Sequence, residues 1–293
     1  MSSTAVVERG FFPTAAAIWE LSKPRITLMV LLTTLGGLWL SHAWRPMLVL
    51  WTLVGTALIV CGSNALNMYL ERDSDALMKR TRDRPLPSGR MHPDLALWLG
   101  LGSAALGVPV LTFGCNWLTG AIGAASVVLY VLAYTPLKRR SATALLVGAI
   151  PGAAPPLLGY VAGTGEITAG GVALFLILFL WQLPHFIAIS LFRVDEYRAA
   201  GIKTVPGESG ERRAKERIVI YSLLLVVVSL EAVRTGVSGG FYLGSALLLG
   251  GGLVTLSFYG LTADAGGRWA RWYFFYTIVY LPILFFALVV GRR

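Results

Sequence analysis

Three oxygen-bearing side chains recur at four-residue intervals where a long apolar segment of the chain ends. They are Asn67, Glu71 and Asp75. A four-residue step on an α-helix keeps side chains on one face, each about 6 Å further along the axis. Acidic groups are costly near a bilayer core, and a chain seldom places them there without a use. Because Mg²⁺ is usually held by a few carboxylates together with substrate phosphates, the spacing predicts a magnesium site.

A basic stretch at residues 78–89 follows this triplet directly. Positive charge beside metal-binding acids, at the surface of a membrane, indicates chemistry on a lipid diphosphate. The alternative is a solvated loop whose acids only pair with Arg72, Lys79 and Arg80. The triplet spacing continues from the apolar segment and Asn67 lies inside that segment, so we favour a functional site over the solvated loop.

The composition requires a membrane around the elements that carry these residues. The chain has 293 residues, of which 56% are hydrophobic and only 14% charged. A soluble domain of this length cannot hide so much apolar surface. We therefore predict an all-α integral membrane protein, one domain over residues 1–293, with nine transmembrane helices. The apolar runs are residues 26–40, 48–66, 95–113, 117–134, 144–162, 168–191, 218–233, 241–261 and 272–290.

The basic residues indicate how the chain is oriented. With the N-terminus in the cytoplasm, 21 of the 25 Lys and Arg residues fall on the inner side, as the positive-inside rule expects. The net charge of +10 therefore belongs to short loops between apolar runs and does not indicate nucleic acid. The two longest loops, at about residues 67–92 and 192–217, lie on the same side. We expect the active surface of this multi-pass protein to face the cytoplasm.

Two further groups could contact a diphosphate. Asp195 and Glu196 lie in the second long loop, where they would share a pocket with the triplet if the two loops approach each other. The alternative for these two acids is an ordinary surface turn. Tyr134 and Lys138 end the fourth span and could supply a hydroxyl and a cation to a phosphate. Taken alone, this pair is equally typical of a membrane-interface anchor, which we favour without further information.

The sixth span carries Gln182 and His185 near its inner end. A buried histidine is often only a hydrogen-bonded structural residue. Inside a membrane span, however, an ionisable group is a functional candidate, and histidine is a common axial ligand of haem iron.

Taken together, these motifs resemble the intramembrane aromatic prenyltransferase superfamily and, within it, the protohaem IX farnesyltransferases, or haem O synthases. The resemblance runs from Lys23 to about Tyr280. The superfamily pattern is the triplet followed by Arg80-Thr81, Arg84-Pro85-Leu86 and Gly89. The segments that resemble the haem-specific members are Tyr134–Arg139, Gly152–Tyr160, Trp181–Phe186 and Asp195–Gly201.

The resemblance implies a central cavity between the nine helices. It also implies farnesyl diphosphate as the prenyl donor and haem b as the acceptor, so that haem b is a substrate and not a cofactor. The product would be haem O, made in a bacterial inner membrane for terminal oxidases, and a haem-oxidising enzyme is the partner expected to take it. Mg²⁺ would be the cofactor. The implied metal ligands are Asn67, Glu71, Asp75 and Asp195, and the implied substrate contacts are Arg80, Arg84, Tyr134, Lys138, Gln182, His185 and Glu196.

Two positions depart from the superfamily pattern. Glu71 stands where Asp is common, and its longer side chain keeps the charge. In the second acidic motif, Phe192 stands at a place where Asp is frequent, so the triplet is the stronger metal site.

Two other functions compete with this interpretation. The Trp181–Phe186 motif argues against a prenyltransferase for a quinone precursor or a chlorin. A multi-pass transporter would place ionisable groups near mid-membrane in repeated halves, whereas here the acids cluster at one face and the two halves do not match.

Overall fold

The computed structural model describes residues 15–262 and 266–293, and helices form nearly all of this part of the chain. The amino-terminal end, including Arg9, lies outside the described residues. Its cytoplasmic location stays a prediction. No β-strand occurs within the described ranges; a single β-bridge joins Ser238 and Arg292. The predicted all-α class is confirmed.

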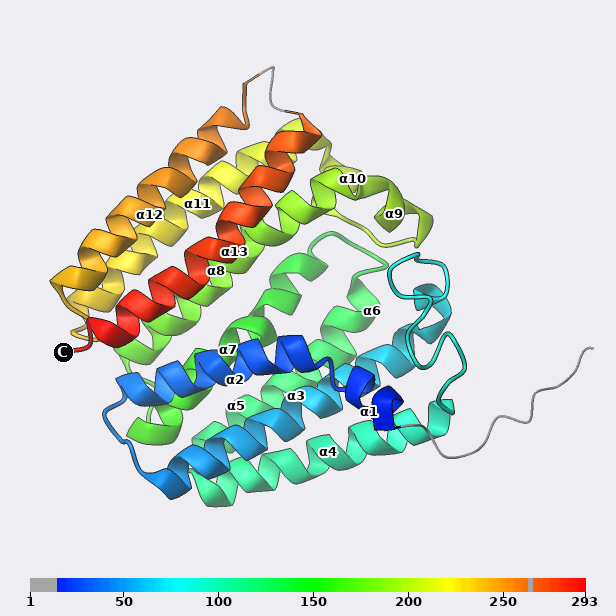
Figure 1. Cartoon of the computed structure of the whole chain (residues 1–293), viewed down its shortest axis with the longest axis horizontal. Helices are drawn as coiled ribbons and strands as arrows, with labels where there is room; N and C mark the ends of the chain where they lie inside the picture. The colour runs from blue at the N-terminus through cyan, green and yellow to red at the C-terminus, as the bar shows by residue number, and fades with distance from the viewer. Residues whose placement is uncertain (1–14, 263–265) are drawn as a thin grey trace, which may run out of the picture.

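The helices follow in chain order (Figure 1). Their bounds are α1 Ala15–Leu21, α2 Pro24–Leu40, α3 Pro46–Asp75, α4 Pro93–Gly114, α5 Trp117–Val128, the π-helical segment η1 Leu129–Tyr134, α6 Thr135–Leu137, α7 Ala144–Thr164, α8 Ala169–Phe192, α9 Val194–Ala199, α10 Val205–Ser209, α11 Glu211–Arg234, α12 Gly240–Tyr259 and α13 Gly267–Val290.

Seven helical segments in the described part of the chain are long and apolar enough to cross a membrane. They are α3, α4, the continuous segment Trp117–Leu137, α7, α8, α12 and α13. The other two predicted spans also fall on helices. However, α2 has only 17 residues, and α11 begins with the charged sequence Glu-Arg-Arg-Ala-Lys-Glu-Arg. A multi-pass membrane protein is therefore supported, and the count of nine crossings stays a prediction.

Local sequence signals account for several helix starts. Proline occupies the first helical position of α2, α3 and α4, where its missing N–H and fixed φ cost nothing. At the start of α5, the Asn116 side-chain oxygen accepts a hydrogen bond from the backbone N–H of Thr119 at 2.9 Å. The prolines inside α7 do not interrupt it, and α7 runs through all three.

The bundle has two groups of helices that meet along α7 and α8 (Figure 1). One group contains α2 to α5 with α7, and the other contains α8 with α11 to α13. Two glycines allow a close crossing of α2 and α7. A β-carbon at Gly37 would overlap the carbonyl of Pro156, and one at Gly159 would overlap the carbonyl of Thr34. Glycine is required at both positions for this approach, as in other membrane helix pairs.

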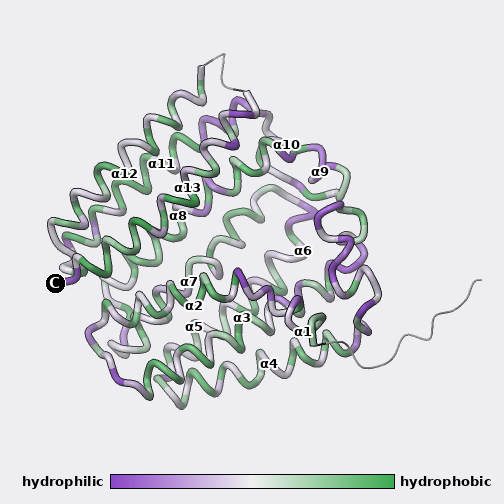
Figure 2. Tube along the Cα trace, viewed as in Figure 1, coloured by the Kyte–Doolittle hydropathy of each residue, from purple (hydrophilic) through white to green (hydrophobic). Residues whose placement is uncertain are grey.

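Polar residues gather at one end of the bundle (Figure 2). The loop after α3 and the short helices α9 and α10 after α8 lie together at this end, and apolar residues dominate along the long helices. At the opposite end, Arg292 donates to the last-turn carbonyl of Trp39 at 2.9 Å and lies over its ring. The terminal arginine therefore caps α2, a role that the distribution of basic residues did not indicate.

Candidate active site

The four-residue triplet lies at the polar end of α3, on a face that is buried. Asn67, Glu71 and Asp75 are only 3–4% exposed, and all three line one cavity of about 600 Å³. The cavity lies between α3, η1, α7 and α8, and residues of the two long loops also line it. The helix extends nine residues beyond the apolar run 48–66, and this extension carries the triplet.

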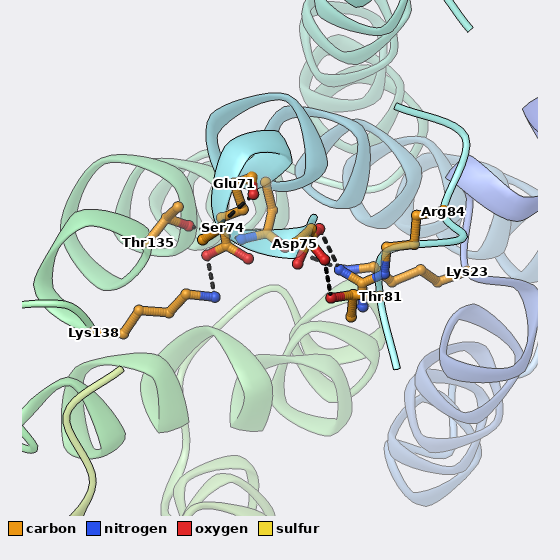
Figure 3. Close-up of polar contacts among 9 residues, drawn as sticks. Lys23, Glu71, Ser74, Asp75, Thr81, Arg84, Thr135 and Lys138 are labelled. Carbon is orange, nitrogen blue, oxygen red and sulfur yellow. Dashed lines mark hydrogen bonds and ion pairs between the residues drawn. The ribbon is translucent and has the colours of Figure 1, made fainter. Parts of the chain in front are cut away.

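Each member of the triplet is held by its own cation, and Figure 3 shows the contacts of Glu71 and Asp75. Lys138 Nζ forms an ion pair with Glu71 Oε1. Arg84 Nη1 donates to Asp75 Oδ2 at 2.7 Å. The third contact comes from Lys23, whose Nζ donates to the amide oxygen of Asn67 at 3.2 Å. The oxygens suited to a metal and the cations suited to a phosphate are thus already in contact.

Hydrogen bonds around the triplet fix its orientation. Asn67 Nδ2 donates to Thr135 Oγ1 at 3.1 Å, so the amide oxygen is turned toward Lys23 and the cavity. Thr135 Oγ1 in turn donates to the Tyr130 carbonyl at 2.8 Å. That carbonyl belongs to the π-helical segment, where the helical ladder is shifted, and such π-bulges occur frequently at functional sites.

The loop after α3 is tied back onto the triplet. Thr81 Oγ1 donates to the Asp75 backbone carbonyl at 2.8 Å (Figure 3). Ser74 Oγ donates to the Glu71 carbonyl at 2.9 Å. These contacts add side-chain donors to carbonyls in the last turns of α3. They also hold Arg84 over the cavity, because Thr81 begins the turn that carries it.

The cavity lining has a surplus of positive charge. Five cationic side chains face two carboxylates there, which leaves three positive charges in excess. This favours a small polyanion such as a diphosphate. Burial, with Arg84 next in importance, lowers the pKa of Lys23 to about 8. The five cations are Lys23, Arg80, Arg84, Lys138 and Lys203.

The loop after α8 contributes to the cavity through residues that sequence reasoning did not select. Tyr197 and residues 202–205 line the cavity. The backbone N–H of Lys203 donates to the Lys138 carbonyl at 2.9 Å, which holds this loop beside the triplet. The predicted acids lie elsewhere. Asp195 has a side chain that is 90% exposed and pairs with Arg198. Glu196 pairs with Arg193 and lines a different pocket.

The two candidates on α8 point in different directions. Gln182 lines the cavity, and its oxygen fits only because Gly152 lies opposite. His185 faces α13, where Nδ1 lies 2.7 Å from Thr277 Oγ1, and its ring stacks on Trp181 and Phe274. His185 lines neither the cavity nor the pocket that Glu196 lines. Of the remaining candidates, Arg80, Tyr134 and Lys138 all line the cavity.

Lys23 and Tyr130 also line the cavity, and sequence reasoning did not select them either. Lys23 has a positive φ of 49° and stands before Pro24, where the right-handed helical conformation is disfavoured. A positive φ cannot be read from the sequence. The available signal was position: Lys23 begins the motif Lys23-Pro24-Arg25, at the start of the first apolar run.

The donor set fits a hard divalent cation. Within the described ranges, no three His, Cys, Asp or Glu side chains are grouped so as to hold a metal. The cavity offers two carboxylates and one amide oxygen on a single helix face. Mg²⁺ commonly takes one or two carboxylates and completes its coordination with water and substrate phosphates, so this smaller set is sufficient.

Comparison with known families identifies the chain. Residues 30–279 match the UbiA prenyltransferase family. The chain belongs to this family. It is 50% identical, over 90% of its length, to the whole of a protein named Protoheme IX farnesyltransferase from Sorangium cellulosum.

Solved structures of this family show the same fold. A digeranylgeranylglyceryl phosphate synthase superposes with a TM-score of 0.83 at 17% identity, covering 94% of this chain and 97% of the other. A UbiA homologue from Archaeoglobus fulgidus, bound to DMAPP and Mg²⁺, superposes with a TM-score of 0.61 at 14% identity, covering 93% and 99%. The resemblance read from the motifs is thus confirmed at the level of family and fold.

Proposed function

We propose that this UbiA family member transfers a farnesyl group from farnesyl diphosphate to a vinyl group of haem b and so makes haem O. The observation that carries the proposal is the buried triplet on α3, in contact with three cations inside one cavity. The acceptor is supported by the 50% identity to a relative named Protoheme IX farnesyltransferase, which this chain matches over its full length.

Asn67, Glu71 and Asp75 would hold Mg²⁺, which when bound stabilises the charge that develops on the leaving diphosphate. This role is supported by the family homologue bound to DMAPP and Mg²⁺. Lys138 and Arg84 would turn from the carboxylates toward phosphate oxygens. Arg80 and Tyr134 line the same cavity and would complete the phosphate contacts.

The reaction balances as an ionisation followed by two additions. The bond between C1 of farnesyl and oxygen breaks, and the electron pair leaves with the diphosphate. The π electrons of the haem vinyl group then form a bond to C1. Water adds to the resulting cation and loses a proton, which gives the hydroxyethylfarnesyl group. Positive charge around the departing diphosphate lowers the barrier of the first step.

The remaining predicted site residues have smaller roles in this proposal than the triplet; they are Asp195, Glu196, Gln182 and His185. Asp195 would contribute to the metal only if α9 rotated toward the cavity, since its carboxylate now pairs with Arg198 at the surface. Gln182 would contact substrate directly, because it lines the cavity. His185 would act on the acceptor side, next to α13.

The same proposal includes the placement in the cell. We propose one domain with nine crossings, the N-terminus and the cavity on the cytoplasmic side, in a bacterial inner membrane. The grouping of polar loops at one end of the bundle supports a single active side (Figure 2). A haem-oxidising enzyme would take the product.

The test is product analysis with purified protein in nanodiscs. Haem b, farnesyl diphosphate and Mg²⁺ are supplied together, and mass spectrometry should show haem whose mass rises by one farnesyl group and one hydroxyl group. Chelation of the metal should remove the product. If haem is unchanged while a hydroxybenzoate or a chlorin is prenylated under the same conditions, the acceptor assignment is overturned.

A further inference from the structure

A second pocket lies outside the cavity, between the polar ends of α8 and α13. Its volume is about 470 Å³. It combines three aromatic rings with two arginines. We call it the α8–α13 pocket; its lining residues are Ile189, Phe192, Arg193, Glu196, Arg271, Phe274 and Phe275.

The arginines of this pocket are poorly neutralised. Arg271 forms no ion pair with any other residue in the described part of the chain. Arg193 pairs with Glu196 through Nη1 at 3.1 Å, but its Nε is buried and has no partner among the described residues. A buried N–H without a partner is costly, so this guanidinium is suited to a further acceptor. Two guanidinium groups and one carboxylate leave a net positive charge.

Aromatic rings form the rest of the pocket. Both guanidinium groups lie over Phe192, Arg271 at 5.7 Å and Arg193 at 5.9 Å from the ring centre. Phe192 meets Phe274 edge to face at 5.6 Å. His185 stacks on Phe274 at 4.6 Å and holds that ring from the α8 side. Flat apolar walls beside two cations fit a planar, conjugated molecule that carries carboxylates.

The α8–α13 pocket adjoins the cavity that holds the triplet. Ile189 lines both spaces, from one turn before the end of α8. A ligand in the α8–α13 pocket would therefore have one edge at Ile189, beside the place where a prenyl chain would lie. Its other edge would reach the arginines at the polar end of the bundle.

We propose that the α8–α13 pocket binds the acceptor, with Arg271 and Arg193 holding its carboxylates. This inference rests on the proposed function, because it takes the acceptor to be a dicarboxylated tetrapyrrole. In protohaem IX the two propionates lie on one edge of the ring system and the vinyl groups lie away from them. Carboxylates at the arginines would thus direct the vinyl edge toward Ile189 and C1 of the donor. Arg271 and Arg193 are binding residues, and His185 positions Phe274.

The experiment titrates haemin into purified protein and follows the Soret band. Arg271→Gln should weaken haemin binding by about tenfold or more, since it removes a charge-assisted contact. Arg268→Gln is the matched control: it removes the same charge from an exposed position one turn earlier on α13, outside the pocket. Its haemin affinity should stay at the wild-type level. Farnesyl diphosphate affinity should be the same in both variants.

A modified ligand separates carboxylate recognition from other effects. Haemin dimethyl ester has no propionate charge, so Arg271→Gln should change its affinity little. Arg193→Gln is the second variant, and it should show the same dependence on the free carboxylates. A general folding defect would weaken the acid and the ester alike, and this result would overturn the proposal.

Two other results would also overturn it. If Arg271→Gln and Arg268→Gln bind haemin equally while wild-type protein makes farnesylated haem, the proposed function stands and the acceptor lies elsewhere. If Arg271→Gln changes only the binding of anionic phospholipid, the pocket is a lipid site. Absence of farnesylated haem from wild-type protein is a separate result, which counts against the proposed function itself.

Discussion

At the scale of single residues, both carboxylates of the triplet are paired with cations. Glu71, Asp75 and Asn67 each contact one cation, from three different segments of the chain. A buried carboxylate without a partner would be costly, and these contacts remove that cost. In the proposed function, Lys138 and Arg84 would turn toward phosphate oxygens when a metal takes the oxygens of the triplet. The proposed metal ligands and phosphate contacts thus lie in contact with each other in the structure.

This pairing leads to a prediction for Asp75. Asp75→Asn keeps the size of the side chain but removes a metal-binding charge and the partner of Arg84, so turnover should fall by about 100-fold or more. Asp73→Asn is the matched control, because Asp73 is on the same helix but its side chain is 87% exposed. Steady-state assays of both variants in nanodiscs measure the difference. Equal turnover would remove Asp75 from the metal site.

The tautomer of His185 gives a second prediction. Thr277 Oγ1 donates its proton to the Phe274 carbonyl at 2.6 Å, so it must accept from His185 Nδ1–H. The lone pair is then on Nε2. His185→Ala should weaken haemin binding, through loss of support for Phe274 or of a nitrogen ligand. The variant His185→Phe distinguishes the two explanations. It should restore haemin binding if the His185 ring only packs against Phe274, and it should fail to restore binding if His185 coordinates iron. Resonance Raman or Soret spectra measure the outcome.

At the scale of elements, the crossing of α2 and α7 determines how Lys23 reaches the triplet. Lys23 precedes α2, and α2 lies against α7 where Gly37 and Gly159 allow backbone contact. Gly37→Ala should destabilise the protein by about 1–3 kcal/mol, because the added methyl overlaps a carbonyl that cannot move easily. Gly102→Ala on α4, where nothing lies within 4 Å, is the control. Thermal unfolding in detergent should show a lower midpoint for Gly37→Ala only.

The helices were largely predictable, because hydropathy and helix length are local properties. Each predicted apolar run falls on a helix, and the triplet spacing located the polar extension of α3. The loop after α8 was harder. Asp195 looked like a metal ligand, yet the structure directs it outward to Arg198, and a backbone contact between Lys203 and Lys138 fixes the loop. Such tertiary contacts leave no periodic pattern in the sequence.

At the scale of the whole molecule, the orientation in the membrane can be tested by labelling. We expect the loop after α3 to face the cytoplasm and the loop between α2 and α3 to face outward. In a variant without Cys61 and Cys115, a membrane-impermeant maleimide should label Arg45→Cys in intact cells. Asp83→Cys, whose side chain position is 87% exposed, should react only after the membrane is opened. The reverse pattern would invert the proposed topology.

The length of α3 has a consequence for where the chemistry takes place. Its 30 residues extend about 45 Å, whereas a bilayer core is about 30 Å thick. With Pro46 placed at the outer edge of the hydrocarbon, Asn67, 21 residues later, would stand about 32 Å along the helix and just beyond the core, and Asp75 would stand near the headgroups. A prenyl diphosphate can therefore keep its tail among the acyl chains while its head reaches the triplet. Because the length of α3 sets the position of the triplet relative to the bilayer, we expect the turnover rate to depend on bilayer thickness.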